Sequence, residues 1–195
     1  MARPRQNANA IPTVQRILSS AEQAFAGHGY ERARLADIAR GAGITRPSLL
    51  YHFKSKDALY VAVLAQNLTA MTGAFDAVMS SEHPYDQQLL ELIQAYVDFL
   101  ESRKAFSALI LRELVNKQGR MRVPIRDMFA PVIDNIERWV VRSGRTPPAV
   151  PARAALMHLA TDALVRTASG DIRGPLWGPD EGTIALARRM LLAED

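Results

Sequence analysis

Apolar residues recur along most of this chain with the spacing of amphipathic helices. Side chains three, four and seven positions apart fall on one face of an α-helix. The first such stripe begins after Pro12, ends near Gly29 and contains Val14, Ile17, Leu18, Ala21, Ala24 and Phe25. No convincing strand pattern occurs along the chain, so the sequence predicts an all-α fold.

The stretch 35–59 predicts two short helices joined by a glycine turn and followed by a third helix. Leu35 and Ile38 share one face of the first helix. Gly43 stands where the chain needs a positive φ to leave that helix. Thr45 then offers a hydroxyl that can cap the second helix.

The second short helix has an apolar inner face and a polar, basic outer face. Leu49 and Phe53, four positions apart, anchor it to a core, and Pro47 is tolerated in its first turn. The outer residues are Arg46, Ser48, Tyr51, His52, Lys54 and Lys56. A tight glycine turn followed by such a helix is typical of a DNA-binding helix-turn-helix.

The rest of the chain predicts a helical bundle. A long helix is expected from about Lys56 to Met79, and Pro84 begins the next one. Residues 106–111 are apolar almost all round, as in a helix buried inside a bundle. Pro131 is expected to kink a later helix, and the segment 145–151, RTPPAVP, predicts a stiff connector.

The last two helices contain many small residues. Residues 152–169 form one of them, and a second follows an expected Asp180 cap. The second one has an apolar seam of Ile184, Ala187, Met190 and Leu191. Small side chains let helix backbones approach closely, either between two copies of the chain or inside one monomer.

Charge is distributed unevenly along the 195 residues. Residues 1–60 contain nine Lys/Arg and four Asp/Glu, whereas residues 61–195 contain fifteen and sixteen. The net charge of +4 is therefore +5 at the N-terminal end and −1 elsewhere. A basic surface kept for solubility would explain the charge alone equally well, but the helix-turn-helix in the same segment favours DNA.

The N-terminal third resembles the tetracycline-repressor (TetR) family of one-component bacterial transcription regulators. It follows the family's order without a gap, through Thr13, Arg16-Ile17-Leu18, Ala24-Phe25, Gly29-Tyr30, Asp37-Ile38-Ala39, Ala42-Gly43-Ile44-Thr45, Tyr51-His52-Phe53 and Ser55-Lys56-Asp57. The resemblance implies a helix-turn-helix DNA-binding domain with a basic N-terminal tail at residues 1–55. It also implies a helical effector-binding and dimerisation domain at residues 56–195.

The family positions imply phosphate contacts on a double-stranded DNA operator. Thr45, Tyr51, His52 and Lys56 match positions that make such contacts. Lys56 also lies in the first turn of a helix capped by Ser55, where exposed N–H groups attract phosphate. These contacts fix a protein on the duplex without reading its sequence.

The leading end of the recognition helix is expected to enter the major groove. Arg46 can bond guanine O6 and N7, Ser48 can donate or accept, and Pro47 can pack on a thymine methyl. Two residues depart from the family. Arg34 replaces a capping Thr or Ser and either contacts a phosphate or is simply solvated, and Leu50 replaces a frequent tyrosine.

In TetR-like proteins the body holds a mostly apolar cavity, and the two final helices form the homodimer. The corresponding lining here would be Tyr96, Phe99, Phe106, Met128, Trp139, Met157 and His158. Each of these residue types is more often plain core than a ligand contact, so core packing stays open for all seven. A mainly apolar or aromatic small-molecule effector is expected, and two-fold homodimers are the commonest oligomers.

The sequence contains no motif for catalysis. It has no phosphate loop, paired-histidine metal motif or nucleophile elbow, and no cysteine. We therefore expect no enzyme, metal or cofactor. No apolar run is expected to approach membrane-spanning length, which favours a cytoplasmic protein.

The sequence favours a repressor that its effector releases from a near-palindromic operator. Two alternatives remain open. One is a helix-turn-helix regulator without a small-molecule effector, acting as an activator or controlled by a partner protein. The other is a helical small-molecule-binding protein with a vestigial DNA-binding head.

Overall fold

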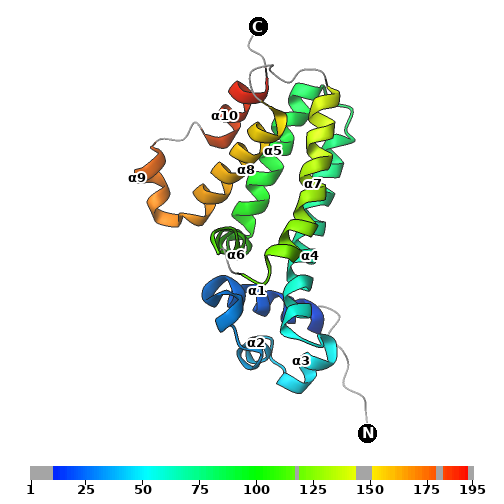
Figure 1. Cartoon of the computed structure of the whole chain (residues 1–195), viewed down its shortest axis with the longest axis vertical. Helices are drawn as coiled ribbons and strands as arrows, with labels where there is room; N and C mark the ends of the chain where they lie inside the picture. The colour runs from blue at the N-terminus through cyan, green and yellow to red at the C-terminus, as the bar shows by residue number, and fades with distance from the viewer. Residues whose placement is uncertain (1–10, 117–118, 144–150, 179–181, 193–195) are drawn as a thin grey trace. The chain divides into compact units, whose positions relative to one another are not determined.

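The computed structural model describes residues 11–116, 119–143, 151–178 and 182–192 (Figure 1). These residues form helices and no strand, which confirms the all-α prediction. The expected N-terminal tail, most of the connector 145–151 and the Asp180 cap lie outside the described residues. The chain packs as two units, Met1–Leu64 and Ala65–Asp195.

The first unit contains three helices and the start of a fourth. They are α1 (Thr13–Arg32), α2 (Leu35–Gly41), α3 (Arg46–His52) and α4 (Lys56–Met79). The ring of Tyr60 on α4 lies 4.8 Å from that of Phe25 and 5.3 Å from that of Tyr30. The first turns of α4 therefore belong to the core of this unit. The division between the units consequently falls inside α4, and not at residue 55 as the sequence suggested.

Helix α1 differs from its prediction in two places. Val14 is 42% exposed, so it does not belong to the buried stripe that continues through Ile17 and Phe25. Gly29 breaks the helical geometry with φ 75° and ψ 166° as expected, but the helix resumes and ends at Arg32. Only glycine adopts this φ without strain, which explains why the break occurs here.

The second unit is a bundle formed by the rest of α4 and the helices that follow it (Figure 1). These are α5 (Tyr85–Ser102), α6 (Lys104–Val115), α7 (Arg122–Arg142), α8 (Ala152–Ala168), η1 (Gly170–Ile172), α9 (Arg173–Trp177) and α10 (Gly182–Leu191). Helix α8 packs against α5, α6, α7 and α10. Helix α7 continues through Pro131 and is assigned as one helix.

The small residues of α8 and α10 are largely buried within one chain. Ala152, Ala155, Ala187 and Leu191 belong to a core cluster that also includes Leu89 of α5. These side chains therefore face the interior of the bundle. On α8, Ala154, Met157, His158 and Thr161 remain exposed.

Helix α4 is long and apolar enough to span a membrane, judged by length and composition alone. The expectation that no apolar run reaches this length was therefore wrong. Core helices of soluble proteins pass the same test. Here Leu59, Tyr60, Val63 and Leu64 are buried in the protein, which is the arrangement of a core helix.

Candidate nucleic-acid interface and ligand cavity

The turn between α2 and α3 has the geometry that the sequence predicted. Gly43 adopts φ 68°, and its N–H donates to the carbonyl of Arg40 at 3.0 Å. The N–H of Ile44 donates to the carbonyl of Ala39 at 3.0 Å. These bonds satisfy carbonyls at the end of α2, because the chain turns back over its own last residues.

Helix α3 begins with the predicted cap. The hydroxyl of Thr45 accepts from the N–H of Ser48 at 3.3 Å, and Pro47 lies in the first turn. Leu49 is fully buried and Phe53 is partly buried, so they hold the inner face of α3 against its unit. The cap satisfies the N–H of Ser48, and the N–H of Leu49 donates to the carbonyl of Thr45 at 3.0 Å.

The outer face of α3 is polar and exposed. Arg46, Pro47 and His52 are exposed, and Tyr51 is 77% exposed. Ser48 is partly buried, while the ring of Tyr51 meets that of His52 with 5.4 Å between centroids. The structure therefore brings these predicted side chains together on one surface.

Lys54 belongs to this surface although it was not among the predicted contacts. Its ammonium lies 5.9 Å from the centroid of the Tyr51 ring. The sequence signal was available, since Lys54 had been assigned to the basic outer face. The family motif simply does not include this position.

Lys56 is placed differently from the other predicted phosphate contacts. Its ammonium donates to the carbonyl of Glu31 at 3.0 Å and lies 4.5 Å from the centroid of the Tyr30 ring. The next residue, Asp57, accepts a hydrogen bond from the Tyr30 hydroxyl. Lys56 therefore ties the start of α4 to α1.

The Ser55 cap and the departure at Arg34 are both as expected. The hydroxyl of Ser55 accepts from the N–H of Ala58 at 3.0 Å. Arg34 precedes α2, makes no side-chain cap and is exposed. The side chain of Arg34 is thus exposed to solvent and does not cap α2.

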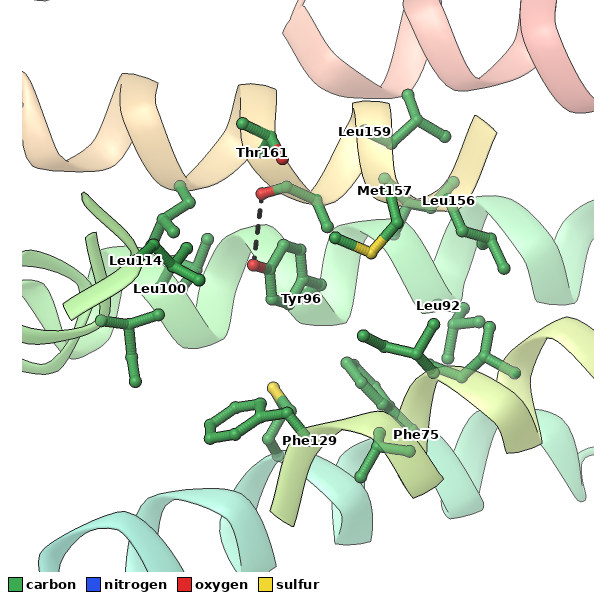
Figure 2. Close-up of a pocket in the computed structure, with 18 of the residues that line it drawn as sticks. Phe75, Leu92, Tyr96, Leu100, Leu114, Phe129, Leu156, Met157, Leu159 and Thr161 are labelled. Carbon is green, nitrogen blue, oxygen red and sulfur yellow. Dashed lines mark hydrogen bonds between the residues drawn. The ribbon is translucent and has the colours of Figure 1, made fainter. Parts of the chain in front are cut away.

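A cavity of about 200 Å³ lies in the second unit, lined by α4, α5, α6, α7 and α8 (Figure 2). Its walls are almost entirely aliphatic and aromatic. The hydroxyl of Tyr96 donates to the carbonyl of Ala160 at 3.3 Å, drawn as a dashed line in Figure 2. Burial raises the pKa of Tyr96, because the phenolate would lose its hydration.

Three of the seven residues predicted to line the cavity do so, namely Tyr96, Phe106 and Met157. The other four residues do not belong to this lining. Phe99 packs on Phe106 beside the cavity, with 5.8 Å between ring centroids. Trp139 packs on Tyr85, with 5.1 Å between centroids, in the core cluster at α5, α8 and α10.

Met128 and His158 were misplaced for a common geometric reason. Each is next to a residue that does line the cavity, Phe129 and Met157 respectively. Consecutive residues of an α-helix are about 100° apart around its axis. His158 is accordingly exposed, not buried as expected.

The sequence analysis missed most of the lining. The missed residues include Met71, Phe75, Leu92, Leu100, Phe129 and Ile133. Their inward orientation could be read from helical periodicity. An apolar inward position looks the same whether it faces a filled core or a cavity, so no sequence signal marked them as lining.

The sequence of this chain is similar to those of known bacterial transcriptional regulators. A sequence model described as "Bacterial regulatory proteins, tetR family" matches residues 17–63. The HTH-type transcriptional regulator RutR of Escherichia coli is 30% identical over 149 residues, which cover 74% of this chain and 69% of RutR. The HTH-type transcriptional activator FasR of Mycolicibacterium smegmatis is 31% identical over 96 residues, 48% of this chain.

The match to FasR spans less than half of that protein, 44% of its length. Among solved structures, the transcriptional regulator FadR from Bacillus subtilis in complex with stearoyl-CoA has a TM-score of 0.71. It is 14% identical, and the alignment covers 90% of this chain and 94% of that one. The structural likeness supports the fold, and the RutR match supports the family: this chain belongs to the TetR family of bacterial transcriptional regulators.

Proposed function

We propose that this TetR-family regulator is a cytoplasmic, ligand-controlled repressor that binds a near-palindromic operator as a homodimer. The observation that supports DNA reading most directly is the contrast across α3. Leu49 is fully buried, whereas Tyr51 is 77% exposed beside Arg46 and His52. A helix anchored on one face and polar on the other can enter a major groove without rearrangement.

We assign base reading to the leading end of α3. Arg46 would bond guanine, Ser48 would donate or accept, and Pro47 would contact a thymine methyl. Thr45, Tyr51 and His52, with Lys54 in addition, would contact phosphates. Arg34 is exposed at the start of α2 and would add another phosphate contact.

Lys56 has a reduced role in this proposal. Its ammonium is engaged by Glu31 and Tyr30, which supports a structural function. It would contribute mainly by positioning the first turn of α4. The domain boundary that we propose accordingly includes the first turns of α4 in the DNA-binding head.

The homodimer would use the outward faces of α8 and α10. The inward small residues of both helices are occupied within one chain. The exposed side of α8 retains Ala154 and His158, which do not line the cavity. In a two-fold dimer the two recognition helices would meet half-sites about one turn apart, ~34–36 Å.

Ligand control would act through α4. Leu59 and Tyr60 of this helix are buried with the head, while Met71 and Phe75 line the cavity. A ligand that fills the cavity contacts α4 directly and can favour one position of this helix over another. Operator affinity would then fall according to the ligand's differential binding to the two states.

The main alternative is a regulator with the opposite sign of control. FasR is named as an activator, so membership of the family is compatible with either sign. A regulator without a small-molecule effector is less well supported, because the cavity is present. A helical binding protein with a vestigial head, or an enzyme, is also less well supported, because α3 is capped and its polar face is exposed.

The proposal can be tested by selecting bound fragments from random DNA. Wild-type protein should enrich a two-fold symmetric sequence. Arg46→Ala should relax base preference at one position of each half-site, with a loss of about 1–3 kcal/mol for the preferred base. Tyr51→Ala should weaken binding to all fragments alike.

Arg138→Ala provides the matched control, because Arg138 is exposed on α7 in the second unit. Its substitution should leave both affinity and preference unchanged. An Arg46 variant that loses affinity without any change in preference would refute base reading by that residue. Absence of any enriched sequence would refute the operator proposal as a whole.

A further inference from the structure

The lining of the cavity offers no partner for a charged ligand. Among the described residues that form its walls, none is acidic, basic or histidine. His158, one of the residues considered for the lining, is exposed on α8 and does not belong to it. A buried ionised carboxylate, phosphate or ammonium needs a compensating charge or several hydrogen bonds, because its hydration is lost.

Tyr96 is the less exposed of the two polar side chains that line this cavity (Figure 2). It is only partly buried. Its bond to the Ala160 carbonyl is long, 3.3 Å compared with a usual ~2.7–2.8 Å for two oxygens. The hydroxyl can therefore exchange this weak bond for a better one.

The second polar side chain of the lining, Thr161, has a different setting. It is exposed on α8, so water can satisfy its hydroxyl. The hydroxyl of Tyr96 stays protonated near neutral pH, because burial raises its pKa. It can thus donate to one ligand oxygen or accept from one ligand hydroxyl.

On the basis of the effector function proposed above, we propose that the cavity binds an uncharged, mainly hydrocarbon ligand with one oxygen-bearing group. Tyr96 is the residue that recognises this group and sets its position. The cavity of about 200 Å³ suits a ligand on the order of ten non-hydrogen atoms, since an apolar cavity of ~150 Å³ holds a benzene molecule. An alcohol or a ketone satisfies these requirements.

The ligand proposed for this chain differs from the ligand of one structural relative. FadR from Bacillus subtilis was solved in complex with stearoyl-CoA, which is anionic and much larger. The described lining here has no cation for such a ligand. Anionic amphiphiles should therefore be poor ligands even when their hydrocarbon part fits.

Calorimetric titration of the full-length protein with 1-octanol and with octanoate near neutral pH tests the ligand charge. The two probes share their hydrocarbon chain and differ at the oxygen-bearing end. We expect 1-octanol to bind and octanoate to bind at least about a hundredfold more weakly. Equal or tighter binding of octanoate or stearoyl-CoA, or no binding of 1-octanol up to its solubility limit, overturns the inference.

The role of Tyr96 is tested by Tyr96→Phe, which deletes only the hydroxyl. Affinity for 1-octanol should fall about threefold to tenfold, the usual effect of one hydrogen bond. Tyr85→Phe is the matched control, because Tyr85 also lies on α5 and its buried hydroxyl is outside the cavity. Equal losses in the two variants would overturn recognition by Tyr96.

DNA binding by the same samples without probe reports the proposed function separately. A protein that binds its selected DNA but prefers octanoate remains a regulator, and only the inference about ligand class fails. A protein that has no DNA affinity loses the proposed function, whatever it binds in the cavity. Thermal unfolding of each variant verifies that the bundle is folded.

Discussion

Two positions close together on α3 have opposite environments. Leu49 is fully buried and Tyr51, two residues later, is 77% exposed. A basic side chain nearby is not automatically free to contact DNA, as Lys56 demonstrates. Its ammonium is shared between the carbonyl of Glu31 and the ring of Tyr30. Exposure and existing partners, more than residue type, distinguish a side chain that can contact DNA from one that holds the protein together.

This distinction predicts different effects on stability. Lys56→Ala should lower the free energy of unfolding of the head by about 1 kcal/mol, because a partly exposed cation–π contact and a hydrogen bond are lost. Tyr51→Ala should change it by less than about 0.5 kcal/mol. Hydrogen exchange of amides in residues 13–64 measures both. Equal effects would contradict the structural role of Lys56.

Tyr96 gives a second prediction at the level of a single residue. Its pKa in the folded protein is raised by burial above the ordinary value of ~10. The unfolded chain therefore loses this proton first, and stability falls as pH rises above about 10. The difference in unfolding free energy between wild type and Tyr96→Phe should shrink from pH ~8 to ~11 in urea titrations. A constant difference would be inconsistent with burial of the hydroxyl.

At the level of elements, glycine acts in opposite ways in a turn and in a helix. Gly43 holds φ 68° between α2 and α3, and a Cβ there would meet only the flexible side chain of Arg16, at 3.3 Å. Strain at this residue would thus come from the backbone. Gly73 lies inside α4, and a Cβ there would meet nothing within 4 Å.

Substitution of these two glycines by alanine should therefore have opposite signs. Gly43→Ala should destabilise the head by about 1–2 kcal/mol, since L-residues are strained in the left-handed region. Gly73→Ala should stabilise by about 0.5–1 kcal/mol, because it reduces the freedom of the unfolded chain. Thermal unfolding compares the two variants directly, and a shift of the same sign in both would refute this argument.

Helix α8 explains why the cavity was harder to predict than the head. Its small and apolar residues are distributed over most of its circumference, so periodicity alone did not separate one face from another. Tertiary packing assigns Ala152 and Ala155 to the core cluster and Ala160 to the cavity wall. His158 then faces solvent. In α3, by contrast, the apolar anchors and the polar residues lie on opposite faces of the helix, and the exposed face was predicted in advance.

At the level of the whole molecule, the uneven distribution of charge predicts how DNA affinity depends on salt. The first sixty residues have a net charge of +5 and the remainder −1. DNA affinity should fall steeply with salt, because each neutralised phosphate releases counterions.

Lys54→Gln should reduce the slope of log affinity against log salt concentration by about 1 for each phosphate contact that is lost. Arg138→Gln is the control, since Arg138 lies in the nearly neutral second unit and should leave the slope unchanged. Anisotropy titrations of labelled DNA at several salt concentrations give both slopes. An unchanged slope for the Lys54 variant would exclude this residue as a phosphate contact.

The amino-acid sequence by itself determined the helical fold, the Gly43 turn, the Thr45 and Ser55 caps and the outward face of α3. These depend on local preferences, such as the φ of glycine, capping hydroxyls and helical periodicity, which act within a few residues. Only the tertiary structure decided that Lys56 is bound to α1, and which apolar residues of five helices leave a cavity. Such contacts depend on how side chains distant in the chain fill space together, and no local pattern encodes the volume that they leave empty.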